Sequence, residues 1–450
     1  MRREVRIRFV IAAMLVAASI LPNLGFQVNT FGFSWNFYRV VIVISMVLIL
    51  ILSRGSFSIA NRKSFLSWMA FFLFWIAYGV ALLVISKYAE RSRGMQEMFA
   101  IACGLLVFFG FSGLSLSTRE REWLLRILFF LLAGLILLGF YEILTANHLS
   151  TSMFKDPNNK TLYRVDPHTA AGIMYNINDF SALLTILCPV VIGRFRIHLR
   201  RGFVDPGWLL VLGVFAINRI NDANICSIGL MLGIFLYFTF SVVRDRRSLG
   251  RVLLAVVLVL AALIAVYLLL GRSTGGLLAR WEQQVSENDV DKGSMHARFL
   301  IYKDALDVSW ESGLMGLGPG GFPEYFTRNP STSGFINPHS MLMELISEYG
   351  LPVFALFMAL LVVLFRRMYR LFRRGPTEEI RNHGLMGVLF IVVYLVASFA
   401  PSSFLLNSYP WAIFALLCLI WEQEKDSLPK EEEVWVSDMQ MGLTKGEETV

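Results

Sequence analysis

The sequence predicts an all-α integral membrane protein with about twelve transmembrane helices. Hydrophobic residues make up 56% of its 450 residues and only 16% are charged, whereas soluble domains average about 25% charged residues. Apolar runs long enough to cross a bilayer recur from one end of the sequence to the other. Most Lys and Arg residues lie in short segments between these runs, which is the pattern of a membrane topology and not of nucleic-acid binding.

Charged and turn-forming residues bound the apolar runs and so define the twelve predicted spans. The first run is followed by Pro22, Asn23 and Leu24, not by a small-residue cleavage site, so we expect it to be retained. The seventh is short, and omitting it would invert the later topology. The spans lie near residues 7–22, 38–52, 65–85, 96–114, 123–143, 178–193, 207–218, 223–242, 251–271, 339–365, 384–401 and 410–421.

Basic residues predict the orientation of the spans. With the N-terminus inside, the short cytoplasmic segments hold 24 Lys and Arg residues and the outer segments hold 14. Nine of those 14 lie in the two longer outer loops, where charge affects topology little. Both termini are therefore predicted to be cytoplasmic. The predicted organisation is spans one to nine with an outer loop at 144–177 (1–271), a large extracytoplasmic loop (272–338), spans ten to twelve (339–422) and a solvated acidic tail (423–450).

The large outer loop is expected to contain short helices. In MHARFLIYKDALDVSW, residues 295–310, Phe299, Tyr302, Ala305 and Leu306 would share one helical face. The segment GLGPGGF, residues 316–322, predicts a tight turn after that helix. The chain shows no internal repeat of the kind that marks many secondary transporters.

His339 is the candidate catalytic residue. It lies in GFINPHSMLMELISEYGLPVF, where the large loop meets the tenth apolar run. A neutral imidazole can accept a proton at neutral pH, and a helix N-terminus disfavours the imidazolium form. The residue therefore suits a general base acting on a hydroxyl at the membrane surface. The alternative is a capping or interfacial histidine, which position alone favours.

Six cations on the outer face could bind an anionic substrate. A guanidinium group stays charged and binds phosphate through two hydrogen bonds. Most of the six are expected to be solvated loop residues, but Arg219 lies between two short spans, and a charge at a helix centre in the membrane costs about 2.5–3.5 kcal/mol. The six are Arg164, Arg219, Arg272, Arg280, Arg298 and Lys303.

Three acidic residues occupy span entrances. Glu344 and Glu348 are one turn apart on one face of the tenth span, and His339 is not on that stripe. We therefore expect these carboxylates to face the protein interior or to pair with an arginine, not to orient His339 directly. Asp179, in NINDF at the start of the sixth span, is interpreted in the same way.

The sequence lacks the motifs of nucleotide-binding and metal sites. The sequence has no GxxxxGK[ST] motif and no GxGxxG after a strand, and no DxD motif or histidine cluster indicates a metal. Cys103, Cys188, Cys226 and Cys418 lie in or beside apolar runs without CxxC spacing, so they are expected to be buried free thiols. No cofactor, metal or nucleic-acid partner is predicted. An enzyme of this kind would need an already activated substrate, such as a lipid diphosphate in the membrane.

Two segments around the large loop resemble sequences of the O-antigen ligase and polymerase superfamily. Members commonly have an Arg-led amphipathic helix followed by a glycine-rich turn, and this chain has HARFLIYKDALDVSWESGLMGLGPGGFPEYF. Members also have a histidine at a span entrance, and this chain has NPHSMLMELISEYGLPVF. The matching residues are His339, Ser340, Leu342 or Met343, and Gly350. The motifs are specific in combination, whereas each alone is weak.

A third segment, YNINDFSALL at residues 175–184, resembles an element at a span start in the same superfamily. With Asp after Asn, it is especially similar to members that act in teichuronic acid biosynthesis in Gram-positive bacteria. The resemblance covers roughly residues 164–352. It implies a GT-C-like fold and an enzyme of the bacterial cytoplasmic membrane. Such an enzyme works without a metal, outside that membrane, on glycans linked to undecaprenyl diphosphate.

The resemblance also implies roles for individual residues. The family's loop arginine falls on Arg298 and its histidine on His339. A Ser-Arg pair that the family tends to have before the large loop is missing from NRINDANICSIGL, so Arg219 or Arg164 would have to supply the second contact with the diphosphate, or activity would be altered. The residues expected to support the site are Glu344, Asp179 and Lys303.

Three functions remain open at this point. The first is inverting glycosyl transfer from a lipid-linked oligosaccharide to a glycan acceptor, by a polymerase or a ligase, alongside other envelope-polysaccharide assembly proteins; the sequence favours a polymerase. The second is a transporter or flippase, which would place ionisable residues at mid-span and repeat its halves. The third is a catalytically silent scaffold that docks through the acidic tail at residues 431–433.

Overall fold

The computed structural model describes most of the chain, and the helices follow the apolar runs of the sequence. The described residues are 2–24, 27–30, 33–53, 62–156, 165–193, 197–198, 203–204, 207–244, 294–329, 337–401, 403 and 407–429. In the first half the helices are α1 (Arg2–Ile20), α2 (Phe37–Ser53), α3 (Lys63–Ile85), α4 (Arg91–Ser112), α5 (Thr118–Thr145), α6 (Ile177–Ile192), α7 (Gly207–Ile220) and α8 (Asn224–Arg244). In the second half they are α11 (Ser294–Glu311), α12 (Gly321–Arg328), α13 (Met341–Glu348), α14 (Gly350–Arg374), α15 (Glu378–Ala397) and α16 (Tyr409–Glu424).

Five of the described helices, α3, α4, α5, α14 and α15, are long and apolar enough to cross a membrane. Shorter apolar helices coincide with the predicted first, second, sixth, seventh and eighth spans. The predicted ninth span, 251–271, lies outside the described residues. The structure is thus mostly helical, as predicted, and it fits a multi-pass membrane protein.

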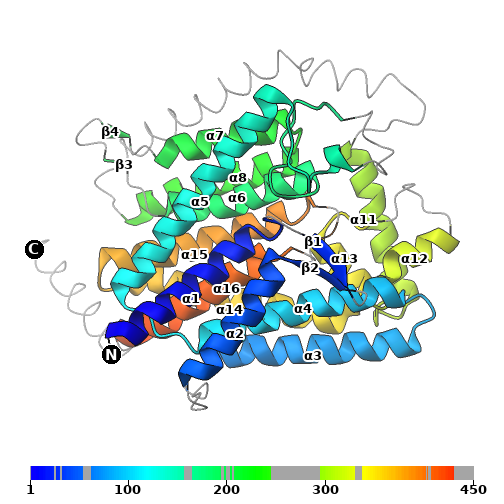
Figure 1. Cartoon of the computed structure of the whole chain (residues 1–450), viewed down its shortest axis with the longest axis horizontal. Coiled ribbons are helices and arrows are strands. Elements are labelled where there is room, and N and C mark those ends of the chain that lie inside the picture. The colour runs from blue at the N-terminus through cyan, green and yellow to red at the C-terminus, as the bar shows by residue number, and fades with distance from the viewer. Residues whose placement is uncertain are drawn as a thin grey trace, which may run out of the picture.

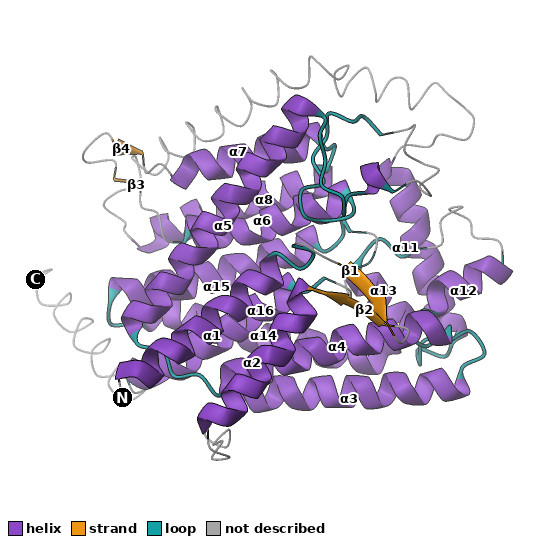
Figure 2. Ribbon diagram, viewed as in Figure 1, coloured by secondary structure: helices purple, strands orange, loops and turns teal. Residues whose placement is uncertain are grey.

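Short strands add to the predicted all-α class. β1 (Gln27–Thr30) pairs antiparallel with β2 (Phe33–Asn36), so that Gln27 faces Asn36, and this hairpin links α1 to α2 (Figure 2). β3 (Ile197–His198) pairs with β4 (Phe203–Val204) between α6 and α7. These two hairpins correct the prediction of a purely helical fold.

The predicted tenth span, 339–365, is wrong as a single helix. The chain forms the eight-residue helix α13, breaks at Tyr349 and Gly350, and continues as α14. Gly350 has a φ of +70°, a left-handed conformation that glycine adopts without steric cost. A Cβ at this position would lie 2.4 Å from the carbonyl oxygen of Leu314. Glycine is therefore required where the two helices meet.

The predicted helix in the large loop is confirmed as α11, and the residues predicted to share one face differ in their burial. Tyr302 is half-buried and Ala305 is buried. Phe299 and Leu306, however, are 67% and 49% exposed, and Ile301 is buried instead. The side of α11 that packs on the protein is therefore not the side that carries Phe299 and Leu306.

The predicted acidic tail is structured at its beginning. Although the tail is predicted from residue 423, α16 continues to Glu424, and a 3-10 turn covers Lys425–Ser427. Arg121 of α5 forms an ion pair with Glu424 and donates a hydrogen bond to Gln423 Oε1 at 2.9 Å. Residues 430–450 lie outside the described residues.

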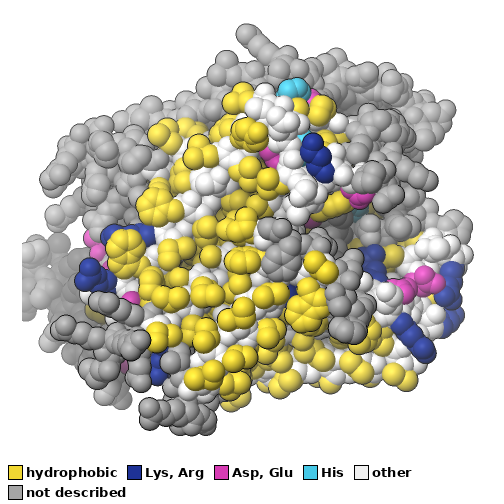
Figure 3. Space-filling model, viewed as in Figure 1, with side chains coloured by type: hydrophobic (Ala, Val, Ile, Leu, Met, Phe, Trp, Pro, Cys, Tyr) yellow, Lys and Arg dark blue, Asp and Glu magenta, His cyan; other side chains and the backbone are white. Residues whose placement is uncertain are grey.

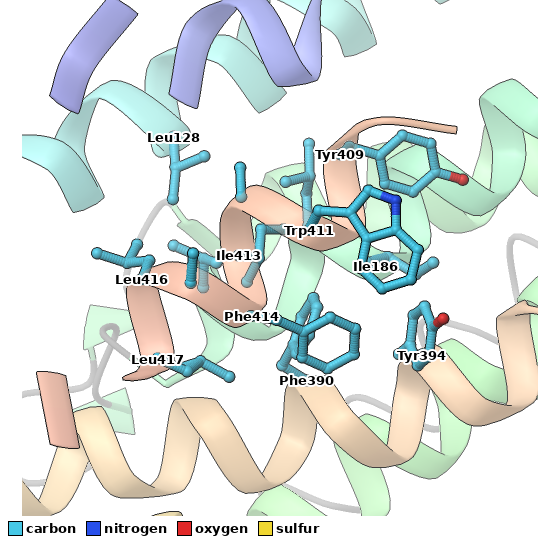
Figure 4. Close-up of a cluster of buried hydrophobic side chains, with 14 of the residues drawn as sticks. Leu128, Ile186, Phe390, Tyr394, Tyr409, Trp411, Ile413, Phe414, Leu416 and Leu417 are labelled. Atoms are coloured by element: carbon cyan, nitrogen blue, oxygen red, sulfur yellow. The ribbon is translucent and has the colours of Figure 1, made fainter. Parts of the chain in front are cut away.

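Helix α16 forms the centre of the core. Its side chains are almost all buried, and Phe414 packs against Phe390 and Tyr394 of α15, with ring centroids 5.1 and 4.9 Å away (Figure 4). Trp411 lies beside them and contacts Phe72 of α3 at 5.2 Å. The four cysteines are free and buried, as predicted.

The bundle has two distinct ends. The first residues of α1 lie at one end, and α11, α12 and α13 lie at the other (Figure 1). On the face drawn in Figure 3, hydrophobic side chains cover the middle and most charged side chains lie toward the two ends. This distribution suits helices whose middle sections contact lipid.

Candidate functional site

His339 lies just before α13 in a strained backbone conformation. Its φ is +47°, which is uncommon for a residue other than glycine. Ser340 is the N-cap of α13, and its hydroxyl accepts a hydrogen bond from Met343 N at 3.5 Å. The next amide, Met341 N, donates to Ser398 O at 3.2 Å. His339 is therefore held at the start of α13 beside the end of α15.

Arg298 binds the same short segment that holds the start of α13. Its guanidinium donates hydrogen bonds to the carbonyl oxygens of Phe399 and, at 3.3 Å, of Ala400. The hydroxyl of Tyr302, one turn further along α11, also donates to Phe399 O, at 3.4 Å. Residues 398–400, here called the 398–400 turn, thus connect Arg298 to the helix that follows His339.

The surroundings of His339 keep its imidazole neutral. Burial, followed by the positive charge of Arg298, lowers the pKa of His339 from 6.5 to about 4. Both causes act against the imidazolium form. Arg298 and the chain just after His339, 41 positions apart in the sequence, both contact the 398–400 turn. At neutral pH the ring can therefore accept a proton, although it is a weaker base than an ordinary histidine.

Asp179 lies near the same place, in the first turn of α6. Asn176 is the N-cap of α6 and accepts a hydrogen bond from Asn178 N at 2.8 Å. Ala182, three positions after Asp179, packs with Cys226 of α8 and with Ala400, whose carbonyl oxygen binds Arg298. Of the predicted site residues, the structure thus brings His339, Arg298 and Asp179 into one neighbourhood.

The other predicted cations do not form a cluster in the described structure. Arg219, in the last turn of α7, is half-buried and donates a hydrogen bond to Asn224 Oδ1. Lys303 is exposed on α11. Arg164, Arg272 and Arg280 lie outside the described residues.

Glu344 and Glu348 face the protein interior, as predicted, and a third buried carboxylate joins them. Glu97 of α4, Glu344 and Glu348 are fully buried, and one carboxylate oxygen of each lies within 4.8 Å of the others. Arg93 acts electrostatically on all three and donates from Nε to Glu97 Oε1 at 3.3 Å. Glu344 also accepts a hydrogen bond from Ser403 Oγ at 2.5 Å. The ion pair of Arg93 in this cluster is with Glu97, and an arginine partner for Glu344 or Glu348 stays a prediction.

The glycine-rich turn is confirmed, and it packs against the end of α13. Gly316, Gly318 and Gly320 have φ values of +89°, +92° and +66°. The Gly320 amide donates to Glu97 Oε2 at 3.1 Å and to Glu348 Oε2 at 3.2 Å. The buried carboxylates therefore bind main-chain donors of the turn, which satisfies part of their hydrogen-bonding capacity.

Sequence reasoning missed Arg93 and Glu97. A signal was present, because Glu97 falls at the start of an apolar run and ionisable residues within spans are rare and commonly functional. Arg93 precedes it by four residues, the spacing of an ion pair on one helix face. Their neighbours Glu344 and Glu348 are some 250 positions away, so their convergence required the fold.

Two groups of side chains among the described residues could hold a metal ion. One is Glu97, Glu344 and Glu348, and the other comprises Glu122, Glu379 and His383. The second group lines a cavity of about 420 Å³ at the first turns of α5 and α15. His383 and Ser398 are 15 residues apart along α15, which is about 22 Å at 1.5 Å per residue. This cavity is therefore remote from His339.

Comparisons with known proteins agree with the motifs. Residues 225–358, which include Arg298 and His339, match a family described as O-Antigen ligase. The chain is also 22% identical over 433 residues to the teichuronic acid biosynthesis protein TuaE of Bacillus subtilis (strain 168). That similarity covers 92% of this chain and 84% of the relative. The predicted resemblance to the O-antigen ligase and polymerase superfamily, and to its teichuronic acid biosynthesis members, is thereby confirmed.

Proposed function

We propose that this protein is a membrane glycosyltransferase that polymerises saccharides linked to undecaprenyl diphosphate, for a polysaccharide of the cell envelope. The observation that carries the proposal is that Arg298 and the start of α13, next to His339, contact the same 398–400 turn. Moving a sugar from a diphosphate to a hydroxyl is helped by two groups: a neutral imidazole that accepts the hydroxyl proton, and a permanently charged guanidinium that binds the diphosphate. The matched family and relative support the same class of reaction.

In the proposed reaction the acceptor hydroxyl oxygen attacks the anomeric carbon of the lipid-linked saccharide. The bond between that carbon and the diphosphate oxygen breaks, and its electron pair leaves with the diphosphate. His339 takes the hydroxyl proton, which is typically worth about 10²–10⁴-fold in rate. Arg298 stabilises the charge that develops on the diphosphate. Attack opposite the leaving group inverts the anomeric centre, and the chemistry uses no metal.

The membrane arrangement in this proposal follows the predicted topology. Twelve spans in a GT-C-like fold would place both termini in the cytoplasm and His339 on the outer face. The position of the start of α1 at the end opposite to α11–α13 supports this arrangement (Figure 1). A lipid-linked donor in the outer leaflet could then reach Arg298 without leaving the membrane.

The second contact with the diphosphate is proposed for Arg219 or Arg164. Arg219 is a half-buried cation near the start of α8, the helix that also carries Cys226. Asp179 would orient one of these cations or bind a sugar hydroxyl, and Lys303 would attract the anionic donor to the outer face. Glu344 would support the site through Ser403.

The test uses purified protein in lipid with a lipid-linked repeat unit as the substrate. Wild-type protein should produce longer chains and free undecaprenyl diphosphate together. His339→Ala and Arg298→Ala should each abolish both products while the protein still accumulates in the membrane. Arg328→Ala is the matched control, because Arg328 is an exposed residue of the same large loop. Normal elongation by either site variant would remove the role assigned to that residue.

A ligase that transfers the glycan to a terminal acceptor is the second candidate, and the description of the matched family favours it. Both enzymes would use His339 and Arg298 in the same way and would differ in the acceptor. The same assay separates them. Elongation with the lipid-linked repeat as the only acceptor indicates a polymerase, whereas product that forms only after a terminal acceptor is added indicates a ligase.

A further inference from the structure

Helix α13 is held at both ends by one ion pair of α4. Asn337 lies two residues before His339, and its Oδ1 accepts hydrogen bonds from both terminal nitrogens of Arg93 at 3.5 Å. At the other end, the hydroxyl of Tyr349, the C-cap of α13, donates to Glu97 Oε2 at 3.0 Å. A helix of eight residues is not stable by itself in water. Its orientation must therefore come from contacts of this kind.

The Arg93–Glu97 pair is itself fixed in place. Arg93 Nε donates to Glu97 Oε1, and the other oxygen of that carboxylate accepts from Gly320 N and from Tyr349. A Cβ built on Gly320 would lie 3.1 Å from Arg93 Cβ, so the stem of Arg93 packs closely against the glycine-rich turn. The pair therefore connects this turn to both ends of α13.

The backbone at His339 needs such support. A left-handed conformation is unfavourable for a residue other than glycine, and it persists only where the surrounding structure imposes it. The 398–400 turn holds the chain just after His339, through Met341 N. Arg93 holds it just before, through Asn337. A distance of 3.5 Å is long for a hydrogen bond, but the charge of Arg93 strengthens its attraction to the amide oxygen.

We propose that Arg93, fixed by Glu97, positions His339 for glycosyl transfer by holding Asn337. This inference rests on the function proposed above. Arg93 acts through Asn337 and not on the substrate, so it is a positioning residue. A displacement of about 1 Å at a reacting group can cost about 10²-fold in rate. Loss of Arg93 should therefore lower kcat much more than it weakens donor binding.

A double-mutant cycle between Arg93 and Asn337 tests this role. Arg93→Gln and Asn337→Ala should each lower kcat for chain elongation by about 10- to 100-fold and change the donor KM by less than about threefold. The double variant should be no slower than the slower single variant, because both changes remove the same contact. Thermal unfolding of each protein, measured in the same lipid, shows that the compared samples are folded.

Arg93→Lys separates positioning from charge balance. Lysine keeps a positive charge beside the three carboxylates but lacks the forked pair of terminal nitrogens. This variant should recover the thermal midpoint that Arg93→Gln loses, while its kcat stays low. If kcat recovers in step with the thermal midpoint, Arg93 has only a structural role and the inference is overturned.

The control is Arg91→Gln, because Arg91 is an exposed residue two positions earlier on α4. It should keep the kcat of the wild-type protein. The inference is overturned if Arg93→Gln and Asn337→Ala keep the kcat of the wild-type protein. It is also overturned if their losses in kcat multiply in the double variant. In both cases the proposed function stands. If wild-type protein does not elongate the substrate, or if His339→Ala elongates it normally, the proposed function itself fails.

Discussion

Acidification tests the environment of His339 directly. An ordinary histidine has a pKa near 6.5 and would become charged as the pH falls from 8 to 5.5. Burial and the nearby charge of Arg298 lower the pKa of His339 to about 4. The proposed base should therefore stay neutral, and active, over a pH range in which an unperturbed histidine is lost.

The size of the effect follows from these two values. At pH 5.5 an imidazole with a pKa of 6.5 is about 9% neutral, whereas one with a pKa of about 4 is about 97% neutral. The acid limb of kcat/KM, which reports the free enzyme, should thus be flat to pH 5.5 instead of falling about elevenfold. Because the folded pKa is the lower one, stability is intact above pH 6.5. It falls by up to about 3 kcal/mol as the pH drops through 4.

The assay combines kinetics with a direct titration. Initial rates of chain elongation at limiting donor give kcat/KM between pH 8 and pH 5. NMR of ring-labelled histidine in the same lipid follows the six histidines of the chain, and His339→Gln assigns the resonance. Arg298→Gln removes one of the two causes, so it should move the pKa of His339 upward while burial keeps it below 6.5.

Two results would refute this reasoning. The first is a pKa of His339 between 6 and 7 in the wild-type protein, which would mean that the ring is well solvated. The second is a pKa that does not rise in Arg298→Gln, which would mean that Arg298 does not face the imidazole. Either result would leave His339 without the environment on which its assigned role depends.

Two further predictions concern stability and the C-terminal segment. Gly350→Ala should cost more than about 2 kcal/mol, because a left-handed alanine is strained and its Cβ would contact a carbonyl oxygen. Gly134→Ala, where nothing lies within 4 Å, should show no such loss in the same denaturant titration. Glu424→Gln should destabilise by about 3–5 kcal/mol, because it leaves Arg121, with a 5% exposed side chain, without its counter-charge. Deletion of residues 428–450 should leave chain elongation unchanged. If the deletion abolishes elongation, the scaffold function is favoured instead.

Features set by local sequence could be predicted. Composition and the length of the apolar runs indicated a membrane protein, and the buried cysteines followed from their place in those runs. The helix in the large loop and the turn after it were evident from periodicity and from closely spaced glycines. These signals suffice because each depends on residues that are neighbours in the chain.

Features set by contacts between distant segments could not be predicted. Gly350 followed by Pro352 is a local helix-stop signal, but it does not reveal the partners that hold α13 on the far side of the break. The amphipathic pattern of α11 does not tell which side packs on the protein: Asp304 and Ser309 are buried, whereas Phe299 and Leu306 are exposed. The proximity of Arg298 and His339 was a hypothesis taken from a family resemblance, and only the 398–400 turn explains it.

The break after α13 also explains why the glycine-rich turn accompanies the histidine segment. A helix end leaves carbonyl oxygens without partners, and in an apolar environment each costs several kcal/mol. The turn supplies the missing donors: Leu317 N donates to Ser347 O at 2.9 Å and Gly318 N to Glu348 O at 2.8 Å. In return, Leu351 N of α14 donates to a carbonyl just before the turn, at 2.8 Å. A continuous helix would have used these groups internally. The two segments that resemble the superfamily are therefore one structural unit, in which the turn stabilises the break at the end of the short helix that follows the imidazole.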